Sequence, residues 1–221
     1  MGDGKVLLGS GSGRPAAALI TGDASVSITP GTNTLQVDMT ETAGAMVKIS
    51  TATASTSASI DFTDLTSTYF MYIIRFNDLA PATDATTLFL RTSTDNGVSF
   101  DSGASDYAWS MNIVKQTGSE DGSRDQSDTG ITIMGDAASS DEMGNGTNET
   151  GSGTIYIYNP SAVKYTFINS EGFYFNEEAE NICAYAGGYR KSAADVDAVQ
   201  LIMDSGSITS GSFVLYGVKN T

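Results

Sequence analysis

The stretch from residue 69 to residue 79 constrains the fold of this chain more than any other. Large apolar side chains occupy every second position in it, at Phe70, Tyr72, Ile74 and Phe76. Because successive side chains of a β-strand point to opposite faces, this period of two predicts a half-buried strand and excludes a helix. The run ends at Pro81, since proline has no N–H group to donate to a neighbouring strand.

A second alternating run, over residues 87–91, follows this strand and leads to Asn96 and Gly97. Both residues tolerate the positive φ angles of a type I′ turn, so Asn-Gly between strand-forming residues is a strong hairpin signal. Residues 98–100 would supply the returning strand. The centre of the chain is therefore predicted to be antiparallel β-structure.

The same alternation recurs along most of the chain. Short strands are predicted around Val26 and Ile28; Leu35, Val37 and Met39; Val47 and Ile49; Ile60 and Phe62; residues 107–113; Ile155 and Ile157; Tyr165 and Phe167; Phe173 and Phe175; and residues 182–189, 199–203 and 212–218. The sole tryptophan, Trp109, is expected to face the core. Residues 50–59 are small and hydroxylated, and they fit either a loop or an exposed strand. Many short strands without an amphipathic helix predict an all-β fold, an antiparallel β-sandwich of jelly-roll type.

The two ends of the chain differ in character. Residues 23–221 are predicted to form one sandwich domain, which the length of 221 residues allows. Residues 1–22 are predicted to be a flexible, extended N-terminal arm with a glycine-rich hinge. The arm is either a disordered terminus or a segment that orders against another chain, since its apolar residues exceed what a free tail needs. These candidate attachment residues are Val6, Leu7, Leu8, Leu19 and Ile20.

Residues 116–153 are predicted to be an acidic insertion loop, because Gly, Ser, Thr, Asp and Glu dominate there and only residues 130–134 are apolar. Flexible loops rich in carboxylates can bind Ca²⁺. The residues available for this are Glu120, Asp121, Asp125 and Asp128. The spacing of an EF-hand loop is absent, so we expect a solvated loop without a metal.

Three more acidic residues, Glu177, Glu178 and Glu180, lie close to the aromatic residues 173–175. Carboxylates beside aromatic rings occur in glycosidase sites and in sugar-binding platforms. A charged turn is the more common result of such a pattern, and it is the one we expect here.

Composition excludes several classes of function. The 26 acidic and 11 basic residues give a net charge of −15, which opposes binding to nucleic-acid phosphates. The chain has no histidine, so a catalytic triad with a histidine base is excluded. The single cysteine, Cys183, allows no internal disulfide and is predicted to be a small core residue. We expect no catalytic residue, no metal and no cofactor.

No stretch approaches the roughly 20 consecutive apolar residues that a membrane span needs, so no membrane partner is expected. The first residues lack the apolar segment of a signal peptide. The sequence therefore predicts a soluble protein that is made in a cytoplasm.

Several local motifs resemble those of one family. They are Ser-Ile-Asp-Phe at 59–62, the segments 67–69, 77–84 and 93–100 with Tyr107, Ile-Tyr-Ile-Tyr-Asn-Pro at 155–160, and the closing segment 207–218. With these motifs the chain, over about residues 45–219, resembles the jelly-roll structural proteins of tailed bacteriophages. The acidic segment 116–153 departs from that pattern. Motif residues of the family serve turns and core packing, so the resemblance implies no catalytic residue.

The resemblance implies a place in the virion. Members of the family are capsid decoration proteins, of cement or head-fibre type, or they are tail-fibre or receptor-binding modules. The first expectation is a decoration protein made in the host cytoplasm, a homotrimer that binds the major capsid protein on the outer head surface and stabilises it. The alternative is a tail-fibre or receptor-binding subunit that contacts host glycans, although no repeat, coiled coil or β-helical shaft is visible. A polysaccharide hydrolase ranks third.

Overall fold

The computed structural model describes residues 5–8, 16–19, 26–31, 34–39, 46–136, 138 and 141–219. Strands are the only regular structure in these residues, so the prediction of an all-β protein is confirmed. The chain divides into two compact units, Met1–Gly44 and Ala45–Thr221. The predicted domain boundary at residue 22 and the proposed glycine-rich hinge lie outside the described residues.

The first unit contains two antiparallel strand pairs. Strand β1 (Lys5–Leu8) pairs with β2 (Ala16–Leu19), and β3 (Val26–Gly31) pairs with β4 (Thr34–Met39). The alternation that predicted β3 and β4 is confirmed. These two strands pair only with each other in the described part of the chain, so they form a sheet of their own and do not extend the sandwich.

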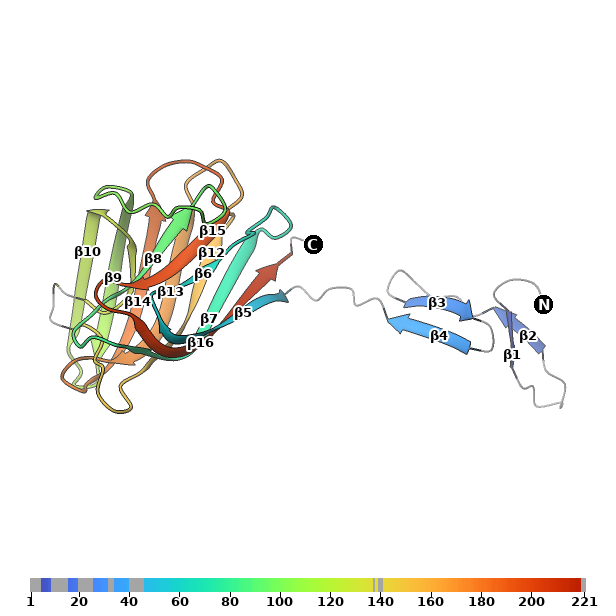
Figure 1. Cartoon of the computed structure of the whole chain (residues 1–221), viewed down its shortest axis with the longest axis horizontal. Coiled ribbons are helices and arrows are strands. Elements are labelled where there is room, and N and C mark those ends of the chain that lie inside the picture. Colours follow the sequence, from blue (N-terminus) through green and yellow to red (C-terminus); the bar gives the residue numbers. More distant parts are fainter. Residues whose placement is uncertain are drawn as a thin grey trace. The chain divides into compact units, whose positions relative to one another are not determined.

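The second unit contains two antiparallel sheets, and Figure 1 labels all of their strands except β11. The large sheet has eight strands in the order β10 (Glu120–Asp128), β9 (Tyr107–Lys115), β14 (Asn181–Arg190), β13 (Phe167–Phe175), β12 (Gly151–Tyr158), β7 (Met71–Pro81), β16 (Ile208–Val218) and β5 (Met46–Ser57). The small sheet has four strands in the order β11 (Ile131–Met134), β8 (Leu88–Ser93), β15 (Ala198–Met203) and β6 (Ser59–Phe62). Side chains from both sheets form one hydrophobic core, as a β-sandwich requires.

Strand β7 lies inside the large sheet, between β12 and β16. Tyr72, Ile74 and Phe76 are buried at alternate positions, so the predicted half-buried strand is confirmed. The ring of Phe76 stacks on that of Phe213 of β16, with 6.0 Å between the ring centroids. Phe70 precedes the strand and remains 42% exposed, so the core side of the alternation begins at Tyr72.

The hairpin predicted at Asn96 and Gly97 is only half correct. Both residues adopt positive φ angles, 56° and 80°, as the turn requires. The residues that follow form no strand, and Val98 is 85% exposed. The prediction of a returning strand at 98–100 is therefore wrong.

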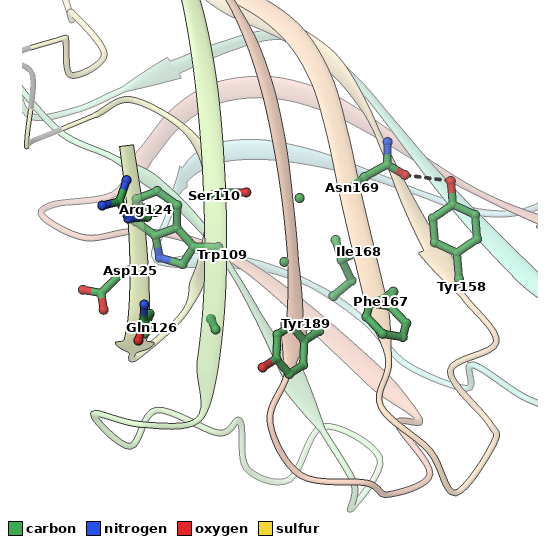
Figure 2. A pocket seen from close by; sticks show the side chains of 13 residues that line it. Trp109, Ser110, Arg124, Asp125, Gln126, Tyr158, Phe167, Ile168, Asn169 and Tyr189 are labelled. Carbon is green, nitrogen blue, oxygen red and sulfur yellow. Dashed lines mark hydrogen bonds between the residues drawn. The ribbon is translucent and has the colours of Figure 1, made fainter. Parts of the chain in front are cut away.

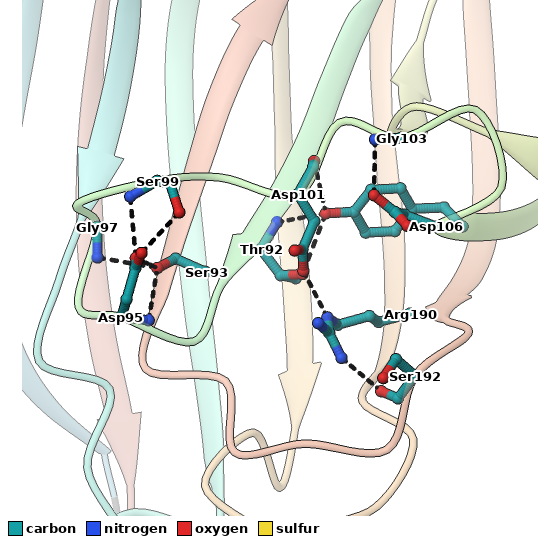
Figure 3. Close-up of polar contacts among 11 residues, drawn as sticks. Thr92, Ser93, Asp95, Gly97, Ser99, Asp101, Gly103, Asp106, Arg190 and Ser192 are labelled. Atoms are coloured by element: carbon teal, nitrogen blue, oxygen red, sulfur yellow. Dashed lines mark hydrogen bonds and ion pairs between the residues drawn. The ribbon is translucent and has the colours of Figure 1, made fainter.

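A carboxylate takes the place of the missing strand pairing, as Figure 3 shows. Asp95 accepts hydrogen bonds from the Ser99 hydroxyl at 2.6 Å, the Ser99 N–H at 2.9 Å and the Ser93 hydroxyl at 2.7 Å. These bonds favour the charged form and lower the pKa of Asp95 to about 2. Short polar side chains can satisfy local donors in this way and so compete with strand pairing.

The acidic segment 116–153 is not one loop, because two strands and the start of a third lie within it. Strand β10 extends through its first third and pairs with β9 at the edge of the large sheet, and β11 belongs to the small sheet. The apolar residues 130–134 indicated β11. Strand β10 gave no signal because both of its faces are largely exposed, so no alternation of apolar residues marks it.

Two smaller questions are resolved by the large sheet. Residues 50–57 belong to the edge strand β5, which is mostly exposed, so this segment is an exposed strand. Cys183 is exposed, and its prediction as a core residue is wrong. Its neighbours Ile182 and Ala184 are buried, and the alternation of β14 therefore directs Cys183 to the outer face.

A buried phenol, that of Tyr107, holds the loop after β8 against the sandwich. The Tyr107 hydroxyl accepts a hydrogen bond from the Thr92 N–H at 2.7 Å and donates one to the Asp101 carbonyl oxygen at 3.1 Å. Burial raises the pKa of Tyr107 to about 12. Arg190, itself buried, forms an ion pair of 2.6 Å with the Asp101 carboxylate, so the same loop is held from two sides.

We expect Tyr107→Phe to lower the free energy of unfolding by about 1–3 kcal/mol, because it leaves a buried amide and a carbonyl without their partner. Denaturant titration measures the change. Tyr185→Phe is the matched control, since Tyr185 is 57% exposed and its hydroxyl makes no hydrogen bond to the described residues. Equal stabilities of the two variants would contradict the importance of this phenol.

Candidate functional site

Three aromatic residues lie next to one another on the outer face of the large sheet. Tyr158 of β12 pairs with Phe167 of β13, which pairs in turn with Tyr189 of β14. Their strand neighbours Ile157 and Ile168 are buried, so these three side chains point away from the core. Tyr158 is 41% exposed and Phe167 is 56% exposed. We call Tyr158, Phe167 and Tyr189 the aromatic row.

A hollow of about 590 Å³ lies beside the aromatic row. Gly187 of β14 pairs with Ser110 of β9, which pairs in turn with Arg124 of β10. The small side chain of Ser110 and the absent side chain of Gly187 leave the space open. A Cβ atom at Gly187 would meet nothing closer than the Ile168 carbonyl oxygen, at 4.0 Å. Figure 2 shows the hollow, whose lining is formed by Ala108, Trp109, Ser110, Arg124, Asp125, Gln126, Tyr158, Phe167, Ile168, Asn169, Gly187, Gly188 and Tyr189.

A second hollow, of about 500 Å³, shares Tyr158 and Phe167 with the first. Lys164 and Tyr165 are among its lining residues. The ring of Tyr165 lies 5.6 Å from that of Tyr189, and the ring of Phe167 lies 5.8 Å from it, centroid to centroid. The two hollows therefore adjoin along a ridge of aromatic rings.

Polar groups surround these rings. The Tyr158 hydroxyl donates a hydrogen bond of 2.7 Å to Asn169 Oδ1, which fixes the tyrosine ring and leaves the Asn169 amide N–H groups available (Figure 2). The side chains of Arg124 and Gln126 have no hydrogen-bond or ion-pair partner among the described residues. The first hollow thus combines flat apolar surfaces with uncommitted donors and acceptors, which is the usual composition of a small-ligand site.

The sequence did not identify this site. The strands at Phe167 and Ile157 were predicted, but the face of the sheet that carries the aromatic rings was not. A usable signal was the Tyr-Ile-Tyr pattern at 156–158, in which tyrosines alternate with a buried isoleucine. A strand with apolar residues on both faces either is buried on both sides or presents one apolar face to a ligand.

The predicted attachment residues Val6, Leu7 and Leu8 lie on β1, and Leu19 lies on β2. The register places Lys5 opposite Leu19 and Leu7 opposite Ala17. The two apolar pieces of the predicted arm therefore pair with each other. Ile20 lies outside the described residues.

The four acidic residues considered for Ca²⁺ are distributed along β10, from Glu120 to Asp128. A strand separates consecutive residues by about 3.3 Å and alternates their directions, so these carboxylates do not converge on one point. No group of three or more Cys, Asp or Glu residues within the described ranges is arranged to hold a metal ion.

The acidic residues 177–180 lie in the turn between β13 and β14, as expected. Asn176 organises this turn, because its Oδ1 accepts hydrogen bonds from the N–H groups of Glu178 at 3.2 Å and Glu180 at 2.8 Å. The Asn176 amide donates to the buried Asp141 at 3.1 Å, and Lys115 forms an ion pair of 2.7 Å with the same carboxylate. The cluster therefore ties the turn to the segment before β12.

Two glutamates at this turn, Glu142 and Glu177, have pKa values above the ordinary value. Burial raises the pKa of Glu142 above its ordinary value of 4.5, and the charges of Asp204 and Asp136 raise it further. Burial also raises the pKa of Glu177, and the charge of Glu142 adds to this effect. The Glu177 N–H donates a hydrogen bond of 3.1 Å to the Glu142 carbonyl oxygen, so the backbone holds these two residues side by side.

Comparison with protein-family models, with curated proteins and with solved structures finds no match to this chain. No helix in the described ranges has the length and apolar character needed to cross a membrane. The features of this protein that bear on its function are the exposed aromatic row, the hollows beside it and the strand pairs of the first unit.

The raised pKa values give a testable pH dependence. Between 4.5 and the raised pKa the folded protein binds more protons than the unfolded chain, so the contribution of Glu177 to stability falls as the pH rises. We expect Glu177→Gln to stabilise the protein at neutral pH and to have a smaller effect below pH 4.5. Denaturant titration at both pH values measures this. Glu120→Gln, on the exposed edge strand, is the control, and an equal effect of Glu177→Gln at both pH values would contradict the assignment.

Proposed function

We propose that this chain is a structural protein of a tailed bacteriophage virion. Its most favoured role is that of a capsid decoration protein, which binds the outer head surface and stabilises it. The observation that carries the proposal is the strand pair β1–β2, a small apolar element in a unit separate from the sandwich. The motif resemblance over residues 45–219 supports the same role.

A two-stranded sheet is at best marginally stable in water, because it has no second layer to cover an apolar face. The β1–β2 pair contains Val6, Leu7, Leu8 and Leu19, and it pairs with no third strand within the described residues. Burial against another chain would contribute about 1.5–3 kcal/mol for each fully buried leucine. The major capsid protein is the partner we propose for this surface.

We further propose that the sandwich is of jelly-roll type and that three copies associate. In a homotrimer, three first units would bind neighbouring capsid subunits at once, and the effective concentration of the second and third contacts strengthens attachment. The net charge of −15 keeps separate molecules soluble until such specific contacts form. We assign the protein to the capsid surface after synthesis in the host cytoplasm.

The second candidate is a tail-fibre or receptor-binding subunit that contacts host glycans. The exposed aromatic row favours it, since rings at 41% and 56% exposure on a sheet face are typical of a binding surface. We do not propose an enzyme. The chain has no histidine to serve as a general base.

We expect deletion of residues 1–22 to leave the thermal transition of the sandwich unchanged and to weaken binding to undecorated phage heads. The reason is that β1 and β2 belong to the other compact unit. Sedimentation of the protein with purified heads measures the occupancy.

The full-length double variant Leu7→Asp, Leu8→Asp tests the same surface without a deletion. Burying a charge against another chain is costly, so two added carboxylates on β1 should weaken a contact that buries this strand. Lys5→Glu is a control of comparable charge change on the same strand. Wild-type occupancy by both the truncated protein and the double variant would show that attachment does not depend on the β1–β2 pair.

A further inference from the structure

We propose that the aromatic row and the hollow beside it bind an uncharged oligosaccharide. The inference concerns a ligand site on the sandwich, so it goes beyond the proposed attachment to heads and does not depend on it. It deepens the second candidate function by naming the site and the class of ligand.

The rings supply the apolar half of such a site. One face of a pyranose ring presents C–H groups, and a flat aromatic side chain covers them with little loss of conformational freedom. Phe167 is 56% exposed and has no polar group that water could satisfy, so its exposure is unfavourable unless a ligand covers it. Tyr158 is oriented for the same purpose by its hydrogen bond to Asn169.

The polar groups of the proposed sugar site lie beside the aromatic row, mostly on the next outward-facing row of residues across the same sheet. The Asn169 amide, the Gln126 amide and the Arg124 guanidinium all line the hollow, and the last two are unpaired within the described residues. Amide and guanidinium groups donate to sugar hydroxyls, and the amide oxygens accept from them. The small residues Ser110 and Gly187 leave the bottom of the hollow open. A sugar ring that lies on the aromatic row can therefore reach the polar groups.

The charges favour an uncharged ligand. The first hollow is lined by one basic residue, Arg124, and one acidic residue, Asp125, and the second hollow adds only Lys164, so the two together have little excess of either sign. The chain as a whole carries −15, which repels anionic polysaccharides and nucleic acids. A neutral sugar avoids that repulsion and needs only hydrogen bonds and stacking.

The volumes of the two hollows are large enough for more than one sugar unit. The hollow of about 590 Å³ falls within the roughly 300–1,000 Å³ of typical ligand sites. The second hollow, of about 500 Å³, continues on the other side of Tyr158 and Phe167, where Tyr165 adds another exposed ring. A linear oligosaccharide that crosses this ridge would use both hollows.

The experiment measures binding of full-length protein to an array of neutral oligosaccharides, followed by calorimetric titration with the best one. We expect Phe167→Ala to weaken binding by about tenfold or more through the loss of a stacking face. Gly187→Leu should weaken it similarly by filling the floor of the hollow. Its fold should be unchanged, because the added Cβ has no neighbour nearer than 4.0 Å.

Phe173→Ala is the matched control, since Phe173 lies on the same strand and is 55% exposed but lines neither of the two hollows. It should change the affinity by less than about twofold. Absence of binding across the array would overturn the proposal, as would an affinity that Gly187→Leu and Phe167→Ala leave unchanged. Loss of head attachment in Phe167→Ala without saccharide binding would also overturn it and would assign the aromatic row to a protein interface. The truncation of residues 1–22 leaves this site intact, so failures of the two proposals are distinguishable.

Discussion

The sandwich depends on covering one face of the eight-stranded sheet with the four-stranded sheet. Tyr72, Ile74 and Phe76 of the interior strand β7 lie in that interface and are almost completely buried. Each such side chain contributes about 1.5–3 kcal/mol when it leaves water, whereas each hydrogen bond of the ladder contributes about 0.5–1.5 kcal/mol net. The layers also approach closely, since a Cβ at Gly188 would come within 2.9 Å of the Ile131 side chain. This packing fixes which side of each strand faces outward, and hence where the aromatic row lies.

Burial of one face also explains which strands the sequence could predict. The interior strand β7 was predicted almost to its ends, because a sheet with one covered face imposes a period of two on Tyr72, Ile74 and Phe76. Strand β10 was not predicted, since neither of its faces is covered and its residues are free to be Ser, Asp or Gly. The returning strand after Gly97 was predicted wrongly because the hydrogen bonds of Asp95 satisfy that loop locally.

The candidate site was less predictable than the fold. Its rings come from three strands, and its amide and guanidinium groups come partly from β10, the strand without a sequence signal. Alternation shows that Phe167 and Ile168 face opposite ways, but it does not say which of the two is covered. Cys183 illustrates the same ambiguity, since its apolar neighbours suggested the core although they are buried on the other side. Pairing across strands, which no single segment encodes, brings Tyr158, Phe167 and Tyr189 together.

The composition of β10 has a consequence for copies of the protein at high concentration. The strand forms an edge of the large sheet, and an uncovered edge is a template on which another sheet can grow. Four of its nine residues are acidic and one is basic. If a second copy extended the sheet there, like charges would face one another across a strand spacing of about 4.8 Å. Lateral polymerisation through this edge is therefore penalised by electrostatic repulsion, and molecules stored side by side remain separate.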